Sequence, residues 1–395
     1  FNTILEHISP VSMVTRTSPN MQRHLVALVA TTITGYLCLV GALSSPKIPQ
    51  RRHYDVVIVG GSAAGLSAAL TLGRSLRNVL VVDGGKPCNR FQNHSHNLLG
   101  FDGESPSDIQ SKARADVQAY ETVEFQDQTL VTSIDQELSG SSDAAYPWTI
   151  SMERQHEAGS ESLPLNQIQC RKLIIATGVK DMLPQDIEGL EECWGKTAIH
   201  CPYCHGYEVR NHRTALTRMD PAVMVVMASI IVRLACRPLY LIGEFDDNSF
   251  TPEESALLER HKEDIVLMTS HRLVGLNHDS GSIQSVRIQH EEGRVEDIPM
   301  AAVYLRPGFE HTFPVDQLKP LLADGDNETP PATVLNEKGY VAVDPTTQKL
   351  LHVPHAFACG DCTDAFRSLS TAMATGTRAA KMLNFELSMQ DWKSR

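Results

Sequence analysis

Hydrophobic residues follow a strand–helix–strand pattern just after residue 50. Residues 54–59 (YDVVIV) form an unbroken apolar run between turn signals, which is typical of a strand buried on both faces of a parallel sheet. Apolar residues then recur at helical spacing over 66–76, and a second apolar run at 79–82 ends on Asp83. This pattern predicts a β-α-β unit.

The rest of the chain has weaker patterns. Residues 122–171 alternate between apolar and polar and are interrupted by Gly/Ser-rich stretches, which predicts antiparallel strands. The other predicted elements are a buried strand at 173–176, a helix within 222–241 and a strand at 238–242, a helix at 253–262 and a final helix at 370–387.

A separate apolar and uncharged run covers residues 25–43, with Arg23 before it and Ser-Ser-Pro after it. The segment 21–44 therefore predicts a signal peptide or signal anchor, and 25–43 is long enough to tether the chain to a membrane. We expect a protein of the secretory pathway or the extracellular space, or a cytoplasmic one if the start of the sequence is a gene-model artefact. Residues 1–50 are excluded from the predicted fold.

Composition narrows the function classes. The chain has 42% hydrophobic and 21% charged residues, as expected of a globular protein, and a net charge of -12. Since no basic cluster accompanies this acidic balance, we expect no nucleic-acid partner. Nine cysteines are too few for a disulfide scaffold in 395 residues.

The turn after the first predicted strand has the composition of a dinucleotide-binding turn. Its residues are Gly60, Gly61, Ser62, Ala63, Ala64 and Gly65, with Ser62 where the pattern usually has its second glycine. Such glycines permit a tight turn and close helix–strand packing, and the helix N-terminus attracts the pyrophosphate. Asp83 is at the spacing expected for a residue that hydrogen-bonds a ribose hydroxyl. A dinucleotide site is therefore predicted.

A second motif, HCPYCH, combines two thiols with two imidazoles. The spacing of Cys201 and Cys204 brings two sulfur atoms within disulfide reach and favours a redox-active pair. His200 or His205 can hold the protons that thiol–disulfide exchange requires. Half of a zinc site and a purely structural disulfide are the alternatives, although a zinc site needs a second ligand pair and we expect no metal.

Together these segments resemble the low-molecular-weight thioredoxin-reductase family of flavoproteins, over roughly residues 54–387. The resemblance depends on VVIVGGSAAGLSAA, Asp83, IIATG, the cysteine pair and ACGDCTDAFRSLSTAMATG. It implies an α/β fold of two Rossmann-like three-layer domains, with FAD as cofactor and a homodimer as assembly. The FAD domain is then discontinuous, 54–195 and 301–390, with a central nicotinamide-domain-like region at 196–300 that carries the cysteines.

The resemblance also implies roles for individual residues. Cys204 would face the flavin, Cys201 would exchange with substrate, and Cys359 and Cys362 would be bystanders beside the cofactor. The expected FAD contacts outside the first turn are Asn93 in a flavin-side loop, Ala176, Thr177 and Gly178, the Gly360-Asp361 pair at the ribityl or phosphate region, and Arg367, Ser368 and Leu369 along the ring.

One departure from the family pattern concerns the nicotinamide nucleotide. Residues 214–222 (TALTRMDPA) contain no glycine where a second dinucleotide turn belongs, and acidic residues at 244–247 oppose a 2′-phosphate. HCPYCHGYE most resembles the fungal dithiol oxidases of the gliotoxin and holomycin type. We therefore expect oxidation of a small-molecule or peptide dithiol, with molecular oxygen as acceptor and hydrogen peroxide as product. The alternatives are an NADPH-dependent thioredoxin reductase and a flavin-binding pseudoenzyme with a degenerate central domain.

Overall fold

The computed structural model describes residues 52–137, 145–155, 163–165, 167–246, 248–318 and 334–395. The chain from Pro49 to Arg395 forms one compact unit. The signal or anchor segment predicted at 21–44 lies outside the described residues. No helix in the described ranges is long and apolar enough to cross a membrane.

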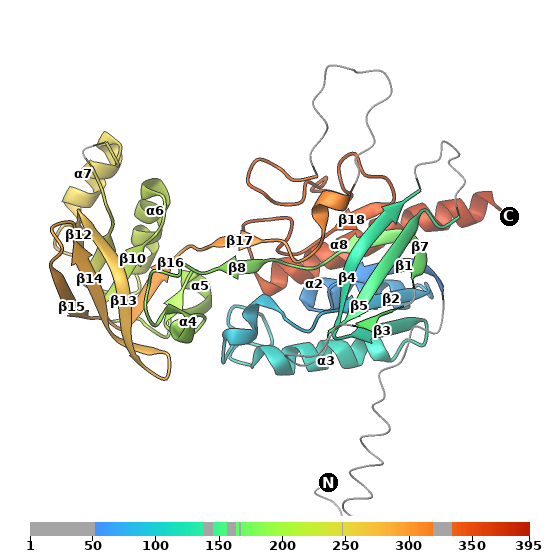
Figure 1. Cartoon of the computed structure of the whole chain (residues 1–395), viewed down its shortest axis with the longest axis horizontal. Helices are drawn as coiled ribbons and strands as arrows, with labels where there is room; N and C mark the ends of the chain where they lie inside the picture. Colours follow the sequence, from blue (N-terminus) through green and yellow to red (C-terminus); the bar gives the residue numbers. More distant parts are fainter. Residues whose placement is uncertain (1–51, 138–144, 156–162, 166, 247, 319–333) are drawn as a thin grey trace, which may run out of the picture. The chain divides into compact units, whose positions relative to one another are not determined.

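The first domain is built on an eight-stranded sheet whose parallel part has the order β3-β2-β1-β7, with β18 beside β7 (Figure 1). The strands are β1 (His53–Val59), β2 (Val79–Asp83), β3 (Val123–Asp127), β4 (Thr129–Gln136), β5 (Trp148–Arg154), β6 (Leu163–Pro164), β7 (Ile168–Ile175) and β18 (Ala356–Ala358). The prediction of antiparallel pairing over 122–171 is confirmed for β4 and β5 and is wrong for β3, which runs parallel to β2.

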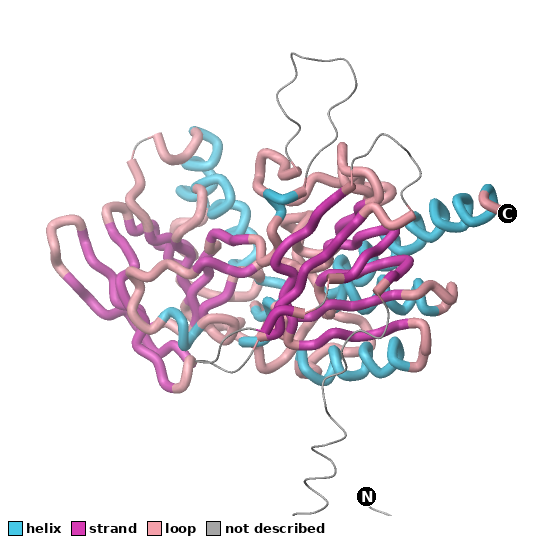
Figure 2. The backbone as a smooth tube through the Cα atoms, turned by 45° about the vertical axis from the view of Figure 1, so that its right-hand side comes forward, coloured by secondary structure: helices cyan, strands magenta, loops and turns pink. Residues whose placement is uncertain are grey.

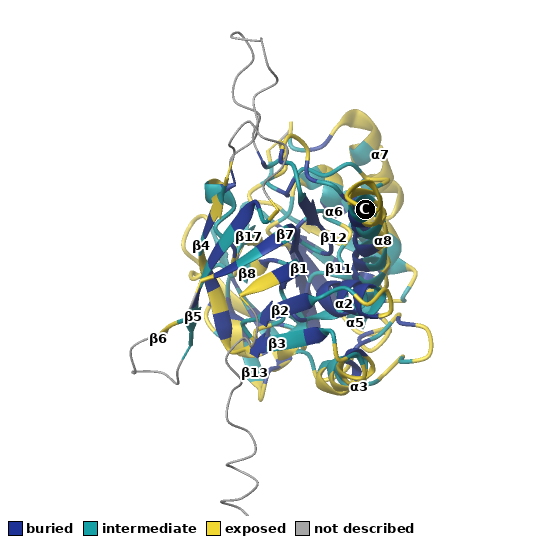
Figure 3. Ribbon diagram, turned by 90° about the vertical axis from the view of Figure 1, so that its right-hand side faces the viewer, coloured by how far each residue is buried: buried dark blue, intermediate teal, exposed yellow. Residues whose placement is uncertain are grey.

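Both faces of the parallel part of this sheet are covered, so β1, β2 and β18 are mostly buried, whereas β4 alternates between buried and exposed residues (Figure 3). Val56 and Ile58 of β1 pack on one face under α2 (Ala63–Gly73) and α8 (Leu369–Lys393). Val57 and Val59 point to the other face and pack against side chains from residues 313–318 and 334–353. This alternation follows from the two-residue period of a strand. A third helix, α3 (Pro106–Gln118), was not predicted.

The central domain contains a parallel sheet of order β12-β11-β10-β16-β9, and Figure 2 shows it as a separate group of strands. Its elements are β9 (Ala198–Ile199), β10 (Thr214–Thr217), α6 (Pro221–Val232), β11 (Leu239–Ile242), α7 (Pro252–Arg260), β12 (Ile265–Met268) and β16 (Ala302–Leu305). One face packs against α6, and the other against an antiparallel sheet of β13 (His271–Asp279), β14 (Ser282–His290) and β15 (Val295–Pro299). The predicted fold class, two Rossmann-like three-layer domains, is confirmed.

Two short strands connect the domains. The chain leaves the first domain through β8 (Lys180–Met182) and returns through β17 (Gly308–Glu310), and the two strands pair with Asp181 opposite Phe309 (Figure 1). Ile187 and Leu190 already belong to the central core, and β16 pairs with β10. The central domain therefore begins before residue 196 and ends after residue 300. It extends beyond both boundaries of the region predicted from the sequence, 196–300. Its smaller helices are α4 (Leu190–Cys193) and α5 (Pro202–His205).

Candidate active site

A cleft with about 1210 Å³ of empty space, part of it open to solvent, brings together distant segments of the chain. The predicted site residues that line it are Ser62, Ala63, Ala64, Ala176, Thr177, Gly178, His200, Cys204, Gly360, Asp361, Arg367, Ser368 and Leu369. Among the other predicted residues, Gly60, Gly61, Gly65 and Asp83 lie beside its wall, whereas Asn93, Cys201 and His205 do not line it.

The turn between β1 and α2 has the geometry that a pyrophosphate requires. Gly60 has φ +111°, and a Cβ there would collide with the carbonyl oxygen of Ala176. A Cβ on Gly65 would collide with the carbonyl of Gly60. Ser62 is the N-cap of α2, but its side chain makes no capping hydrogen bond, so the first N–H groups of the helix remain available to an anion. Asp83, at the end of β2, lies against Gly61.

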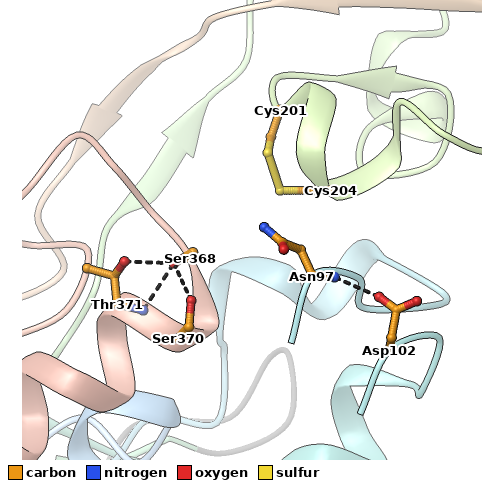
Figure 4. Close-up of a disulfide and its surroundings, with 7 residues drawn as sticks. All are labelled: Asn97, Asp102, Cys201, Cys204, Ser368, Ser370 and Thr371. Carbon is orange, nitrogen blue, oxygen red and sulfur yellow. Dashed lines mark hydrogen bonds between the residues drawn. A yellow bond between two sulfur atoms is a disulfide. The ribbon is translucent and has the colours of Figure 1, made fainter. Parts of the chain in front are cut away.

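A second part of the cleft is built from the segment that precedes α8. Gly360 has φ +78° and allows the chain to turn next to Ala64. The following carboxyl group, Asp361, is partly buried in the wall of the cleft, and desolvation raises its pKa to about 6 against the opposing effect of Arg367. Ser368 caps α8 by accepting a hydrogen bond from the backbone N–H of Thr371 at 3.0 Å (Figure 4).

Cys201 and Cys204 form a disulfide at the opposite side of the cleft. Cys201 is the N-cap of α5, and one turn of this helix brings the two sulfur atoms together. Cys204 lines the cleft and lies close to Asn97 in Figure 4, whereas Cys201 is further from it. No group of three His, Cys, Asp or Glu side chains in the described part of the chain could hold a metal ion.

Two imidazoles accompany the disulfide. His200 lines the cleft and stacks on Trp194 with ring centroids 5.9 Å apart. Burial lowers the pKa of His200, while the charge of Asp181 acts in the opposite direction. Burial also lowers the pKa of His205, with Glu208 opposing it. Both rings are therefore neutral at neutral pH and can accept a proton.

The second C-x-x-C segment has a different arrangement. Cys359 packs in the core on the helical side of the sheet, and Cys362 packs in the core on the other side. Both are free thiols without solvent exposure, and burial raises the pKa of Cys362 to about 12. Because the side chains point to opposite faces, these two cysteines do not form a redox pair.

Several residues that line the cleft were not predicted from the sequence, among them Asp181, Cys88 and His96. Asp181 accepts a hydrogen bond from Arg367 at 2.7 Å and one from the thiol of Cys88 at 3.3 Å. His96 lies with its ring nitrogens 3.5 Å from carboxylate oxygens of Asp102 and Glu208. Only the position of Asp181, soon after the IIATG strand, carries a local signal; the others depend on contacts between distant segments.

Comparison with known proteins gives the family. Residues 54–376 match the family described as pyridine nucleotide-disulphide oxidoreductase. The chain belongs to this family. It is 30% identical over 348 residues to "Thioredoxin reductase sirT" of Leptosphaeria maculans, covering 87% of this chain and 97% of that protein. It is 28% identical to "Thioredoxin reductase aclD" of Aspergillus oryzae, covering 83% and 94% of the two chains.

Solved structures agree with this assignment. The chain in the crystal structure of HlmI is 26% identical to this chain and superposes with a TM-score of 0.68. The match covers 87% of this chain and 95% of that chain. An oxidoreductase from Agrobacterium tumefaciens is 27% identical with a TM-score of 0.64, covering 85% and 99%. This pyridine nucleotide-disulphide oxidoreductase is thus a thioredoxin-reductase-like flavin disulfide oxidoreductase, and its cofactor is FAD. The uncapped turn at Gly60 and the partly buried carboxyl of Asp361 fit that cofactor.

The corresponding turn of the central domain lacks the features that suit the first turn to a dinucleotide. The turn after β10 lacks glycine, and the Asp220 side chain accepts a hydrogen bond from the N–H of Ala222, which removes a donor that a pyrophosphate would use. A cavity is present here, but Arg218 in its wall is paired with Asp186. Glu244 also lines it, where a 2′-phosphate would require a cation.

Proposed function

We propose that this enzyme oxidises a substrate dithiol to a disulfide through Cys201 and Cys204, with oxygen as electron acceptor. The observation that carries the proposal is the contrast between a turn suited to FAD in the first domain and a capped, glycine-free turn in the central domain. A reductase would need the second site, whereas an oxidase needs only the first.

The overall reaction balances without a nicotinamide. A dithiol and molecular oxygen give a disulfide and hydrogen peroxide: two S–H bonds break, one S–S bond forms, and oxygen gains two electrons and two protons. The bound flavin supplies a two-electron acceptor for the enzyme's thiols and a route for these electrons to oxygen.

The exchange steps are assigned to the chain's own residues. A substrate thiolate attacks the sulfur of Cys201, the Cys201–Cys204 bond breaks, and Cys204 is left as a thiolate on the cleft side. The second substrate thiolate then attacks the mixed disulfide and releases Cys201. His200 and His205 are neutral at neutral pH and accept the protons that the two substrate thiols lose.

The solvent side of the disulfide favours a small or peptide dithiol with apolar groups. Tyr203, which lies between the two cysteines, and Tyr207, which follows the motif, are about two-thirds exposed, at 65% and 64%. Large exposed aromatic side chains next to a reactive group are suited to contacts with a substrate.

An NADPH-dependent thioredoxin reductase is the second candidate, because the relatives sirT and aclD are both named thioredoxin reductases. Both candidates share the FAD site and the disulfide. They differ in the source of electrons, which a single experiment distinguishes.

The test is an anaerobic titration of the purified flavoprotein, with dithiothreitol in one sample and NADPH in the other. We expect dithiothreitol to bleach the visible absorbance of the flavin, admission of air to restore it with release of hydrogen peroxide, and NADPH to have no effect. Bleaching by NADPH would establish the reductase instead. Cys201→Ser should abolish bleaching by the dithiol, and Cys236→Ala, which changes a buried free cysteine of the central core, should not.

A further inference from the structure

Asp181 occupies a position at which the linker between the domains meets the cleft. It lies on β8, opposite Phe309 of β17. One oxygen of its carboxylate accepts from Arg367 at 2.7 Å, and the other accepts from the thiol of Cys88 at 3.3 Å. Only 8% of the Asp181 side chain and 14% of the Arg367 side chain are exposed, so solvent screens this ion pair weakly.

Arg367 is held from two sides. Its guanidinium lies 5.2 Å from the centroid of the Phe309 ring, which is the strand neighbour of Asp181. Its pKa is raised although burial lowers it, because the hydrogen bond to Asp181 and a further one to Tyr340 favour the cation. The linker strands therefore fix the side chain that immediately precedes the N-cap of α8.

The charges around the cleft are few. Asp181, Asp361 and Arg367 all line it, and the charges of Asp181 and Arg367 act on Asp361 and on His200 in opposite directions. The Asp181 carboxylate compensates the Arg367 cation. A group that gains electrons in this cleft acquires negative charge, which a nearby cation favours and a nearby carboxylate opposes.

We propose that Asp181 is a positioning residue that holds Arg367 on the linker and, by neutralising it, sets the reduction potential of the flavin bound in the cleft. The inference goes beyond the proposed function and depends only on FAD binding. Because the potential is measured without oxygen or dithiol substrate, it can fail while the oxidase proposal stands, and the reverse is equally possible.

The test compares Asp181→Asn with Glu310→Gln. Both substitutions remove one carboxylate charge from the β8–β17 ladder, but Glu310 pairs with Lys180 in an exposed ion pair away from the cleft. The readout is the flavin midpoint potential, measured by equilibration with a reference dye. For Asp181→Asn we expect the midpoint potential to become more positive by at least about 30 mV, which corresponds to a tenfold change in the equilibrium constant of a two-electron couple. Glu310→Gln should keep the wild-type potential.

Two further variants keep the proposal falsifiable. Arg367→Gln should shift the potential in the negative direction, and the Asp181→Asn/Arg367→Gln double variant should return toward the wild-type value, since both charges are gone. An unchanged potential in Asp181→Asn overturns the proposal, as does an equal shift in Glu310→Gln. If Asp181→Asn loses its flavin, Asp181→Glu must retain both flavin and potential; loss of flavin in that variant also overturns it.

Discussion

The two domains each contain a β-strand, a tight turn and a helix at the same point of the Rossmann pattern, yet the two turns differ in every feature that matters for a dinucleotide. In the first domain, Gly60 has a positive φ and the N-cap Ser62 leaves the N–H groups of α2 uncapped. In the central domain, Arg218 has a positive φ of 54° and Asp220 caps α6 with its own carboxylate.

This comparison indicates that a dinucleotide site requires a helix N-terminus whose first N–H groups have no side-chain cap. An N-terminus that a side chain already caps has fewer donors for a phosphate, and a carboxylate there repels it. The central domain keeps the buried strands and the helix of the Rossmann pattern although its turn is built differently.

The largest effect is expected for Gly60→Ala. The new Cβ would collide with the carbonyl oxygen of Ala176, in a backbone region that L-residues rarely adopt. We expect FAD affinity to fall at least a hundredfold, about 3 kcal/mol, measured as the ratio of flavin to protein absorbance after dialysis.

The matched control is Gly293→Ala. Gly293 also has a positive φ, +86°, but no atom lies within 4 Å of the position that a Cβ would take, so this variant carries the backbone strain without the collision. Its flavin content should equal that of the wild type. Equal loss of flavin in both variants would mean that strain, and not the shape of the first turn, explains the result.

The carboxyl group of Asp361 is expected to make the free energy of unfolding depend on pH. Its pKa is raised to about 6 in the folded protein, so the folded state binds a proton more tightly than the unfolded state between about pH 4 and pH 6. Stability is therefore lost as pH rises through this window, by about 3 kcal/mol for the shift of the Asp361 pKa from 3.8 to about 6. Asp361→Asn should remove this loss.

The measurement is urea unfolding of the flavin-free protein at several pH values. Burial lowers the pKa of His355 to about 4, so in the same pH window the unfolded state keeps a proton that the folded state has lost. The contribution of His355 to stability therefore increases with pH, opposite to that of Asp361. The difference between Asp361→Asn and wild type isolates the carboxyl. A difference that does not change with pH would contradict the assigned pKa.

The first turn was predictable from the sequence because its signals are local. The apolar run of β1, the glycines and Asp83 lie within about thirty residues of one another. The helix α3 was missed because only Ile109 and Val117 of its thirteen residues are buried, which leaves little apolar periodicity. The parallel pairing of β3 was also missed, because each of its residues pairs with a residue of β2 that lies 44 positions earlier, as Val123 does with Val79.

The candidate site shows the same limit. The cysteine pair and its imidazoles are adjacent in the sequence, so their chemistry could be predicted. Asp181 contacts Cys88, which lies 93 positions earlier in the chain, and Arg367, which lies 186 positions later. No local sequence pattern specifies these contacts. Sequence therefore predicts the reactive groups better than the charges that surround them.

The two N-caps, Asp220 and Ser62, are expected to contribute differently to the free energy of unfolding. Asp220→Ala removes the hydrogen bond from the N–H of Ala222 and should cost about 1 kcal/mol of unfolding free energy. Ser62→Ala should cost almost nothing in the flavin-free protein, because Ser62 makes no capping bond. Urea unfolding of both variants provides the measurement; an equal cost would remove the distinction between the turns.

The smallest effect is expected at Arg218, the positive-φ residue of the second turn. Its ion pair with Asp186 is exposed, with 38% and 57% of the side chains accessible. Although the hydrogen bond to Arg218 lowers the pKa of Asp186, solvent screens an exposed pair. Arg218→Ala should therefore cost only a few tenths of a kcal/mol for the lost pair.

Comparison of Arg218→Gly with Arg218→Ala distinguishes the contribution of the ion pair to stability from that of the backbone conformation. Both substitutions remove the pair, but only glycine adopts a φ of 54° without steric cost, so the glycine variant should be more stable than the alanine variant in urea unfolding. Neither should bind NADPH in a fluorescence titration, because Asp220 still caps the helix. Tight NADPH binding to Arg218→Gly would show that one side chain at the turn, and not the capped N-terminus, excludes the nucleotide.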